Sequence, residues 1–135
     1  MKKKVVILGS TGSVGSTTFD IFKKDQKNFE VVLLSTNSNI KKIMSQARQL
    51  KVKNIIINNK KKFIEAKKKY KKKNIKFFNS FEDINNILDK KIYYSMISVS
   101  GLAGLKPSII LPKYSKNLAI VNKESLICGW EIIKK

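Results

Sequence analysis

Short apolar blocks alternate along the chain with segments whose apolar residues recur at helical spacing. We expect a buried strand at each of the blocks Val5–Leu8, Phe29–Leu34, Asn54–Ile57, Tyr94–Val99 and Leu118–Val121, and a shorter extended piece at Ile75–Phe78. The blocks are apolar at consecutive positions, so both faces of each strand are expected to be buried. That pattern is typical of a parallel sheet covered by helices on both sides.

The segments between the strands predict helices. They cover Ser16–Lys24, Ile40–Leu50 with Asn39 as its cap, a lysine-rich stretch between residues 60 and 73, a stretch from the cap Ser80 to about Asp89, a short or bent helix between Pro107 and Pro112, and a final amphipathic helix to Lys135. The sequence therefore predicts one α/β domain over residues 1–135. We expect a Rossmann-type, doubly wound and mainly parallel sheet with helices on both faces.

A glycine-rich turn joins the first strand to the first helix. It reads Gly9-Ser-Thr-Gly-Ser-Val-Gly15. Glycine permits a tight turn and lets backbone N–H groups approach a pyrophosphate at the helix N-terminus, while Gly15 lets helix and strand pack closely. Thr11 and Ser13 add hydroxyl donors. Because the turn lies between a buried strand and a helix, we interpret it as a dinucleotide site rather than a plain turn.

The segment after the second strand indicates which dinucleotide would bind. NAD-specific domains usually carry an Asp or Glu about 20 residues beyond the glycines, which binds the ribose hydroxyls. Here the segment reads Leu34-Ser-Thr-Asn-Ser-Asn39 and has no carboxylate. Hydroxyl and amide groups can donate to the 2′-phosphate of NADP, and Lys41 or Lys42 could supply charge nearby. The sequence therefore favours NADP over NAD.

The chain is strongly basic. Its formal net charge is +20, from 29 Lys and Arg against 9 Asp and Glu, and Arg48 is the only arginine. Lysine, isoleucine and asparagine have AT-rich codons, so genome composition can supply much of this charge. Nucleic-acid modules more often read bases with arginine and present aromatic platforms. We therefore expect no specific nucleic-acid partner, and keep a basic nucleic-acid-binding module as an alternative.

Several further classes of protein are disfavoured. No apolar run approaches the ~20 residues that cross a bilayer, and the N-terminal apolar stretch is too short for a signal peptide, so we expect no membrane partner and a cytoplasmic location. Cys128 is the only cysteine and cannot form an internal disulfide. The chain has no histidine, which excludes histidine acid–base catalysis and a Cys/His zinc site.

Three motifs together resemble one enzyme family. They are Gly9-Ser-Thr-Gly-Ser-Val-Gly15, Gly101-Leu-Ala-Gly-Leu-Lys-Pro-Ser108 and Ala119-Ile-Val-Asn-Lys-Glu-Ser-Leu126. Over essentially its whole length the chain resembles the N-terminal NADPH-binding domain of 1-deoxy-D-xylulose 5-phosphate reductoisomerase. Enzymes of that family are oxidoreductases that make 2-C-methyl-D-erythritol 4-phosphate in non-mevalonate isoprenoid synthesis. The resemblance implies the same reaction for the protein to which this domain belongs.

The resemblance also implies roles for individual residues. It places the NADPH phosphates and nearby ribose at Thr11, Gly12, Ser13 and Val14, the adenosine 2′-phosphate at Asn37, Ser38 and Asn39, the nicotinamide half at Asn122 and Glu124, and the sugar-phosphate substrate at Lys123. A cation at a helix start suits an anionic substrate, whereas without the motif Lys123 would be one more surface lysine. Family members often have Gly-Lys-Asn at the 2′-phosphate, so Asn37 and Ser38 depart from the pattern and Asn39 matches.

Length is the larger departure from the family. Its carboxylates for Mg²⁺ or Mn²⁺, its substrate-phosphate serines and its flexible lid belong to a catalytic domain that would begin after Lys135. We interpret Glu82-Asp83 as a helix N-terminus rather than a metal site. We therefore expect this chain to hold no catalytic residue and no metal ligand, to bind NADPH without completing the reaction, and to come from a homodimeric enzyme.

A second enzyme hypothesis stays open. Rossmann dehydrogenases of the semialdehyde dehydrogenase type have a similar glycine turn and also need a further domain. Dinucleotide binding would separate both enzyme hypotheses from the basic nucleic-acid-binding module.

Overall fold

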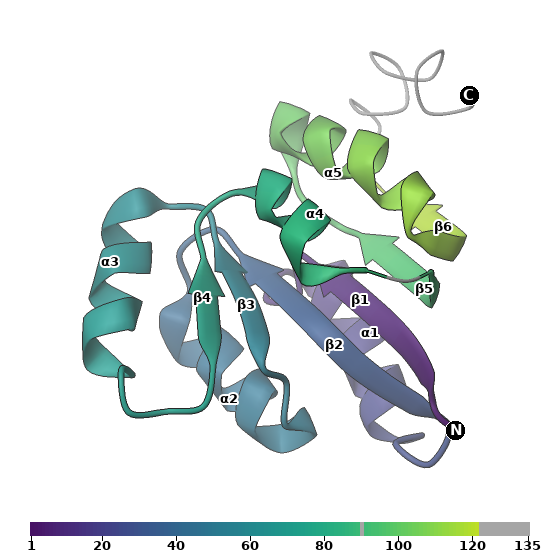
Figure 1. Cartoon of the computed structure of the whole chain (residues 1–135), viewed down its shortest axis with the longest axis horizontal. Coiled ribbons are helices and arrows are strands. Elements are labelled where there is room, and N and C mark those ends of the chain that lie inside the picture. Colours follow the sequence, from purple (N-terminus) through teal and green to yellow (C-terminus); the bar gives the residue numbers. More distant parts are fainter. Residues whose placement is uncertain (90, 122–135) are drawn as a thin grey trace.

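The strands form one parallel sheet. Figure 1 shows the computed structural model, which describes residues 1–89 and 91–121. The strands in chain order are β1 (Lys3–Leu8), β2 (Phe29–Thr36), β3 (Asn54–Ile57), β4 (Lys76–Phe78), β5 (Ile92–Ile97) and β6 (Ser115–Ile120). They lie side by side in the order β4-β3-β2-β1-β5-β6, and every pairing is parallel.

Helices cover both faces of this sheet. They are α1 (Ser13–Lys23), α2 (Ile40–Leu50), α3 (Lys60–Lys69), α4 (Ile84–Ile87) and α5 (Leu105–Ile110), with 3₁₀ turns at Phe81–Asp83, Gly101–Gly104 and Leu111–Lys113. In Figure 1, α4 and α5 lie on the opposite side of the sheet from α1 and α2. The predicted doubly wound fold of Rossmann type is therefore confirmed.

The central strand β1 shows how the two faces are filled. Val5 and Ile7 belong to an apolar cluster that includes Phe19 of α1, residues of α2 and Ala66 of α3. Val6 and Leu8 belong to a second cluster, with residues of α4 and α5. Because successive side chains of a strand point to opposite faces, a strand between two helical layers is apolar at most of its positions. Residues Val5–Leu8 are accordingly all 0% exposed.

Several element boundaries were predicted correctly from local sequence signals. The structure confirms the expected bounds of α2 and β3, and the side chain of Asn39 accepts the N–H of Lys42 as a cap. Ser80 and Asp83 form a reciprocal capping box, which confirms that Glu82-Asp83 is a helix start. The helix before Pro112 ends at Ile110 and continues as a 3₁₀ turn, as expected for a short or bent helix.

Other boundaries were predicted wrongly. The first helix begins at Ser13, three residues before the expected start, and α4 ends at Ile87 rather than near Asp89, because Leu88 has an extended backbone. β5 and β6 each begin and end earlier than expected. Pairing with β1 sets the end of β5 at Ile97, and β6 starts at the polar Ser115, whose hydroxyl bonds that of Ser95 at 2.6 Å. The predicted final helix lies outside the described residues.

Within residues 1–89 and 91–121, none of the helices has the length and apolar character needed to cross a bilayer.

One exposed ion pair joins the 3₁₀ turn Phe81–Asp83, which precedes α4, to α5. The ammonium of Lys106 hydrogen-bonds the carboxylate of Glu82. This hydrogen bond, together with the positive charge of Lys106, lowers the pKa of Glu82 below its ordinary value. Because the folded-state pKa is lowered, the stability that the pair contributes is present at neutral pH and is lost as pH falls through that pKa.

Lys106→Met is expected to raise the pKa of Glu82 toward its ordinary value, because the hydrogen bond and the charge are both removed. The acidic part of the stability profile should then depend less on pH. NMR titration of the Glu82 carboxyl carbon in both proteins measures this shift. An unchanged pKa of Glu82 in the variant would contradict the assigned cause.

Candidate functional site

The strand order reverses beside β1. The chain builds β2, β3 and β4 on one side of β1 and then β5 and β6 on the other. In open parallel sheets the loops leave such a point toward opposite faces, and the crevice between them at the carboxyl edge is where ligands bind. A cleft of about 430 Å³ lies there, lined by Gly9, Thr11, Gly12, Ser35, Thr36, Asn37, Asn58, Ser98, Val99, Ser100 and Ala103. The glycine turn therefore opens on the cleft together with the loops after β2 and β5.

The three glycines of the turn serve different purposes. Gly9 has a left-handed φ of 75°, and a Cβ at Gly15 would lie 2.0 Å from the carbonyl oxygen of Gly9. Only glycine at position 15 therefore lets α1 pack this closely on the end of β1. Gly12 has φ −78° and ψ 179°, which any residue can adopt, and a Cβ there would meet only the Gly9 oxygen at 3.7 Å. Gly12 thus leaves space on the cleft side of the turn without being required by the fold.

Buried and half-buried side chains hold the turn in place. The backbone N–H of Gly9 donates to the hydroxyl of Ser35 at 2.8 Å. Gln46 of α2 makes two bonds to Ser10: its amide NH₂ donates to the Ser10 carbonyl and its amide oxygen accepts the Ser10 hydroxyl, both at 2.8 Å. On the other side, the hydroxyl of Ser98 donates to the Leu8 carbonyl at 2.7 Å. The backbone of the turn is therefore fixed from both neighbouring strands before any ligand binds.

The N-terminus of α1 differs from those of α2 and α3. Asn39 and Asn59 cap the latter two with their side chains, whereas Gly12, at the corresponding position of α1, has no side chain to accept a hydrogen bond. The first N–H groups of a helix have no acceptor within the helix. An anion in the cleft would supply that acceptor and would be favoured by the helix dipole. The predicted residues Ser13 and Val14 are exposed on this first turn.

The loop after β2 contacts the glycine turn. The hydroxyls of Thr11 and Thr36 lie 2.7 Å apart, and the Thr36 hydroxyl also accepts the N–H of Asn39 at 3.2 Å. Of the three residues predicted for this loop, Asn37 lines the cleft, whereas Ser38 and Asn39 line a neighbouring groove. The predicted site residues Thr11, Gly12 and Asn37 are therefore brought together in one cleft.

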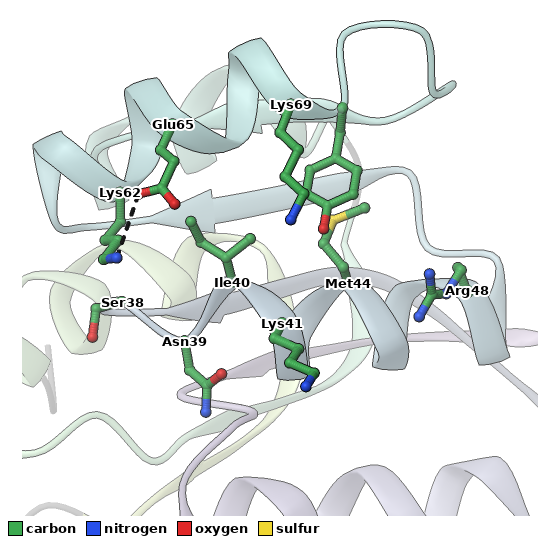
Figure 2. Close-up of a pocket in the computed structure, with 10 residues that line it drawn as sticks. Ser38, Asn39, Ile40, Lys41, Met44, Arg48, Lys62, Glu65 and Lys69 are labelled. Carbon is green, nitrogen blue, oxygen red and sulfur yellow. Dashed lines mark hydrogen bonds and ion pairs between the residues drawn. The ribbon is translucent and has the colours of Figure 1, made fainter.

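The neighbouring groove lies between α2 and α3. Its volume is about 620 Å³, and Ile40, Met44 and Tyr70 provide apolar side chains between cations of both helices. Figure 2 shows Lys62 beside Glu65, with Nζ and Oε2 3.4 Å apart, above Ser38, while Lys41 lies on α2 next to Asn39. This groove is separate from the cleft, since the two share no lining residue.

Three predicted site residues, Asn122, Lys123 and Glu124, lie outside the described residues. Within the described part of the chain, no three Asp, Glu, Cys or His side chains gather closely enough to hold a metal ion.

Comparison with known proteins decides the family. The family model of 1-deoxy-D-xylulose 5-phosphate reductoisomerase matches residues 5–129. The chain belongs to this family. The reductoisomerase of Pelagibacter ubique is 47% identical over 135 residues, and that of the Wolbachia of Brugia malayi is 34% identical over 134 residues. Each comparison covers 98% of this chain but only 35% and 34% of the relatives, so the chain spans about a third of their length.

Solved structures of reductoisomerases share the fold. The Zymomonas mobilis enzyme in complex with NADPH matches with a TM-score of 0.88 and 23% identity, over 98% of this chain and 35% of that chain. A second structure, of a reductoisomerase with NADPH, fosmidomycin and magnesium, matches with a TM-score of 0.85 and 21% identity, over 98% of this chain and 34% of that one. Membership in the reductoisomerase family decides against the semialdehyde dehydrogenase hypothesis.

Sequence reasoning missed the residues that hold the turn of this reductoisomerase domain. Gln46 was predicted only as part of the helix Ile40–Leu50, yet it is 4% exposed among apolar residues on the buried face of that helix, and a polar side chain at such a position indicates a buried polar contact. Ser98 was predicted as strand. Ser98 directly follows β5, which pairs with β1, and its hydroxyl therefore reaches the end of β1. A serine directly after a buried strand was the signal in the sequence.

Gln46→Leu is expected to destabilise the domain by about 2 kcal/mol, because the buried hydroxyl and carbonyl of Ser10 lose their 2.8 Å hydrogen bonds to Gln46 and keep only longer ones, at 3.3 Å, with Ser35 and Ser16. The side-chain volume is nearly kept. Chemical denaturation of both proteins measures the difference. Gln49→Leu, on the exposed face of the same helix, is the control and should change stability little. Equal stability of Gln46→Leu and wild type would contradict the role of Gln46.

Gly15→Ala is expected to destabilise the domain by about 3 kcal/mol or to prevent folding, because its Cβ would collide with the Gly9 backbone. Gly12→Ala should leave the melting temperature nearly unchanged, since its Cβ meets ordinary contact distances only. Thermal melts of the two variants compare these positions directly. If Gly12→Ala lowered the melting temperature more than Gly15→Ala, the turn would have to be packed differently.

Proposed function

We propose that this chain binds NADPH in the cleft at the carboxyl edge of the sheet, as part of an enzyme that converts 1-deoxy-D-xylulose 5-phosphate to 2-C-methyl-D-erythritol 4-phosphate. The observation that carries the proposal is the turn itself. The backbone of the turn packs closely against Gly15, and buried hydrogen bonds from Gln46 to Ser10 fix its conformation. At Gly12 there is space in front of the N-terminus of α1, which no side chain caps. A pyrophosphate supplies the negative charge and the acceptors that this arrangement lacks.

The phosphates are proposed to lie against Thr11, Gly12, Ser13 and Val14. Backbone N–H groups at the start of α1 would donate to the phosphate oxygens, and the Ser13 side chain is exposed beside them. Because the turn is already held by Ser35, Gln46 and Ser98, little backbone ordering is needed on binding. Such preorganisation favours affinity.

The adenosine half is proposed to lie over the end of β2, with its 2′-phosphate near Asn37, Ser38 and Asn39. All three side chains are exposed. The oxygen of the Asn39 side chain already accepts the N–H of Lys42 at 3.1 Å, so the amide NH₂ is the part that can donate to a phosphate. The loop holds no carboxylate to repel the extra phosphate of NADPH.

The nicotinamide half and the substrate are proposed to lie on the other side of the turn. The resemblance assigns the nicotinamide to Asn122 and Glu124 and the sugar phosphate to Lys123. These residues follow β6, which ends at the carboxyl edge of the sheet, where Val121 N–H donates to Ile97 at 3.1 Å. Ala103 and Ser100, on the loop after β5, line this side of the cleft.

NADPH supplies a hydride when bound, and the protein's part is to hold it beside the substrate. From the family resemblance, we place the Mg²⁺ or Mn²⁺ site and the catalytic groups in the remainder of the protein. Two further predictions also concern the whole protein, namely a homodimer and a cytoplasmic location. The nucleic-acid alternative predicts salt-sensitive binding to DNA without NADPH binding.

Gly12→Val is expected to weaken NADPH binding about 30-fold or more, because the branched side chain fills the space that the pyrophosphate would occupy, while the fold tolerates it. Isothermal titration calorimetry of the 135-residue chain measures the affinity, and a thermal melt confirms that the variant is folded. Thr17→Val, on the exposed side of α1, is the control. Unchanged NADPH affinity in a folded Gly12→Val variant would remove the turn from the site.

A further inference from the structure

A lysine on α2 lies at the junction of the glycine turn and the loop after β2. We propose that this residue, Lys42, sets the preference of the chain for NADPH over NADH by supplying the positive charge that the loop itself lacks. The inference rests on the proposed function and adds to it the residue that distinguishes the two dinucleotides.

The loop after β2 offers only neutral groups to a 2′-phosphate. Its side chains are amides and a hydroxyl, from Asn37 to Asn39. A phosphate monoester carries about −1.5 to −2 charges at pH 7, and hydrogen bonds from cationic groups to phosphate are roughly twice as strong as those from neutral donors. Discrimination by charge therefore has to come from a neighbouring element.

Lys42 occupies the right place for this task. Its ammonium donates to the carbonyl oxygen of Thr11 in the glycine turn at 2.9 Å, and Thr11 in turn contacts Thr36 at the end of β2 through hydroxyls 2.7 Å apart. Asn39, at the start of α2, also bonds the Thr36 hydroxyl. The glycine turn, the end of β2 and the start of α2 are thus joined to the ammonium by a chain of three hydrogen bonds. In a bound dinucleotide the adenosine ribose is joined to the pyrophosphate through its 5′ oxygen, so the ribose would lie beside the turn and its 2′ position could face this junction.

The charge of Lys42 is available to a ligand. An ammonium has three N–H donors, and the Thr11 carbonyl uses one of them. Among the described residues, 1–89 and 91–121, the ion pairs are Lys62–Glu65 and Lys106–Glu82. No described carboxylate therefore neutralises Lys42. The side chain is exposed and lies on a helix that is already capped by Asn39. Lys42 is therefore free to form two more hydrogen bonds without a cost in folding.

The adjacent Lys41 provides a matched comparison. It has the same chemistry and is likewise exposed, but it lines the groove between α2 and α3. Figure 2 shows Lys41 on α2 beside Asn39. Lys62 lines the same groove and is paired with Glu65. Position, rather than the general excess of lysine, distinguishes Lys42 from these neighbours.

The test compares the affinities for NADPH and NADH in wild type, Lys42→Gln, Lys42→Arg and Lys41→Gln by titration calorimetry at two salt concentrations. Lys42→Gln should weaken NADPH binding roughly five- to tenfold and change NADH binding little, because only NADPH carries the 2′-phosphate. The salt dependence of NADPH binding should also fall. Lys42→Arg should retain the preference, and Lys41→Gln should behave as wild type. Thermal melts confirm that each variant is folded.

The other outcomes separate the inference from the proposed function. Equal weakening of both dinucleotides by Lys42→Gln would mean that Lys42 only holds the turn through Thr11, which overturns the inference. Loss of the preference in Lys41→Gln instead would overturn it as well, and would place the phosphate in the α2–α3 groove. Wild-type binding of NADPH with an unchanged preference in Lys42→Gln leaves the proposed function standing and refutes the inference alone. Failure of wild type to bind either dinucleotide refutes both.

Discussion

The close backbone contact between α1 and the end of β1 is the constraint on which the site depends. A single methyl group at Gly15 would collide with the carbonyl of Gly9, so the sequence at this position decides how far the helix can approach the sheet. That distance in turn determines where the first N–H groups of α1 lie relative to the carboxyl edge. The cleft therefore derives from a packing requirement of the fold, and its chemistry follows from what the backbone exposes once the packing is satisfied.

Keeping that backbone rigid requires buried polar groups in an otherwise apolar interior. Ser10, Ser35 and Gln46 are at most 4% exposed, yet each forms hydrogen bonds to the turn or within it. An unpaired polar group at such depth costs on the order of 1–3 kcal/mol. Each group is thus tolerated only when its partners are in place, and this makes the turn adopt one conformation. The same network explains why Ser10 and Gln46, which do not line the cleft, still shape it.

The sequence predicted the layers of the fold better than the contacts at the site. Apolar blocks and the cap Asn39 have local causes, so strands and the bounds of α2 could be predicted from a few neighbouring residues. The ends of β5 and β6 depend on pairing with distant strands, and they were misplaced for that reason. Likewise the glycine turn was found from its spacing, whereas the roles of Gln46 and Ser98 depend on contacts with residues 36 and 90 positions away. Nor does the pattern distinguish Lys41 from Lys42; only their positions on the helix surface do.

The bond from Ser98 to Leu8 spans 90 residues and has a consequence for synthesis on the ribosome. The central strand β1 emerges first, and β2 to β4 can pair beside it as they follow. Its other edge stays unpaired until β5 arrives, since contacts between residues so far apart form only after the intervening chain has emerged. Nascent chains that stall earlier expose the apolar edge of the strand that carries the phosphate turn. They are thus prone to aggregation, and they have only one wall of the pocket, so the arrival of β5 both pairs this edge and completes the pocket.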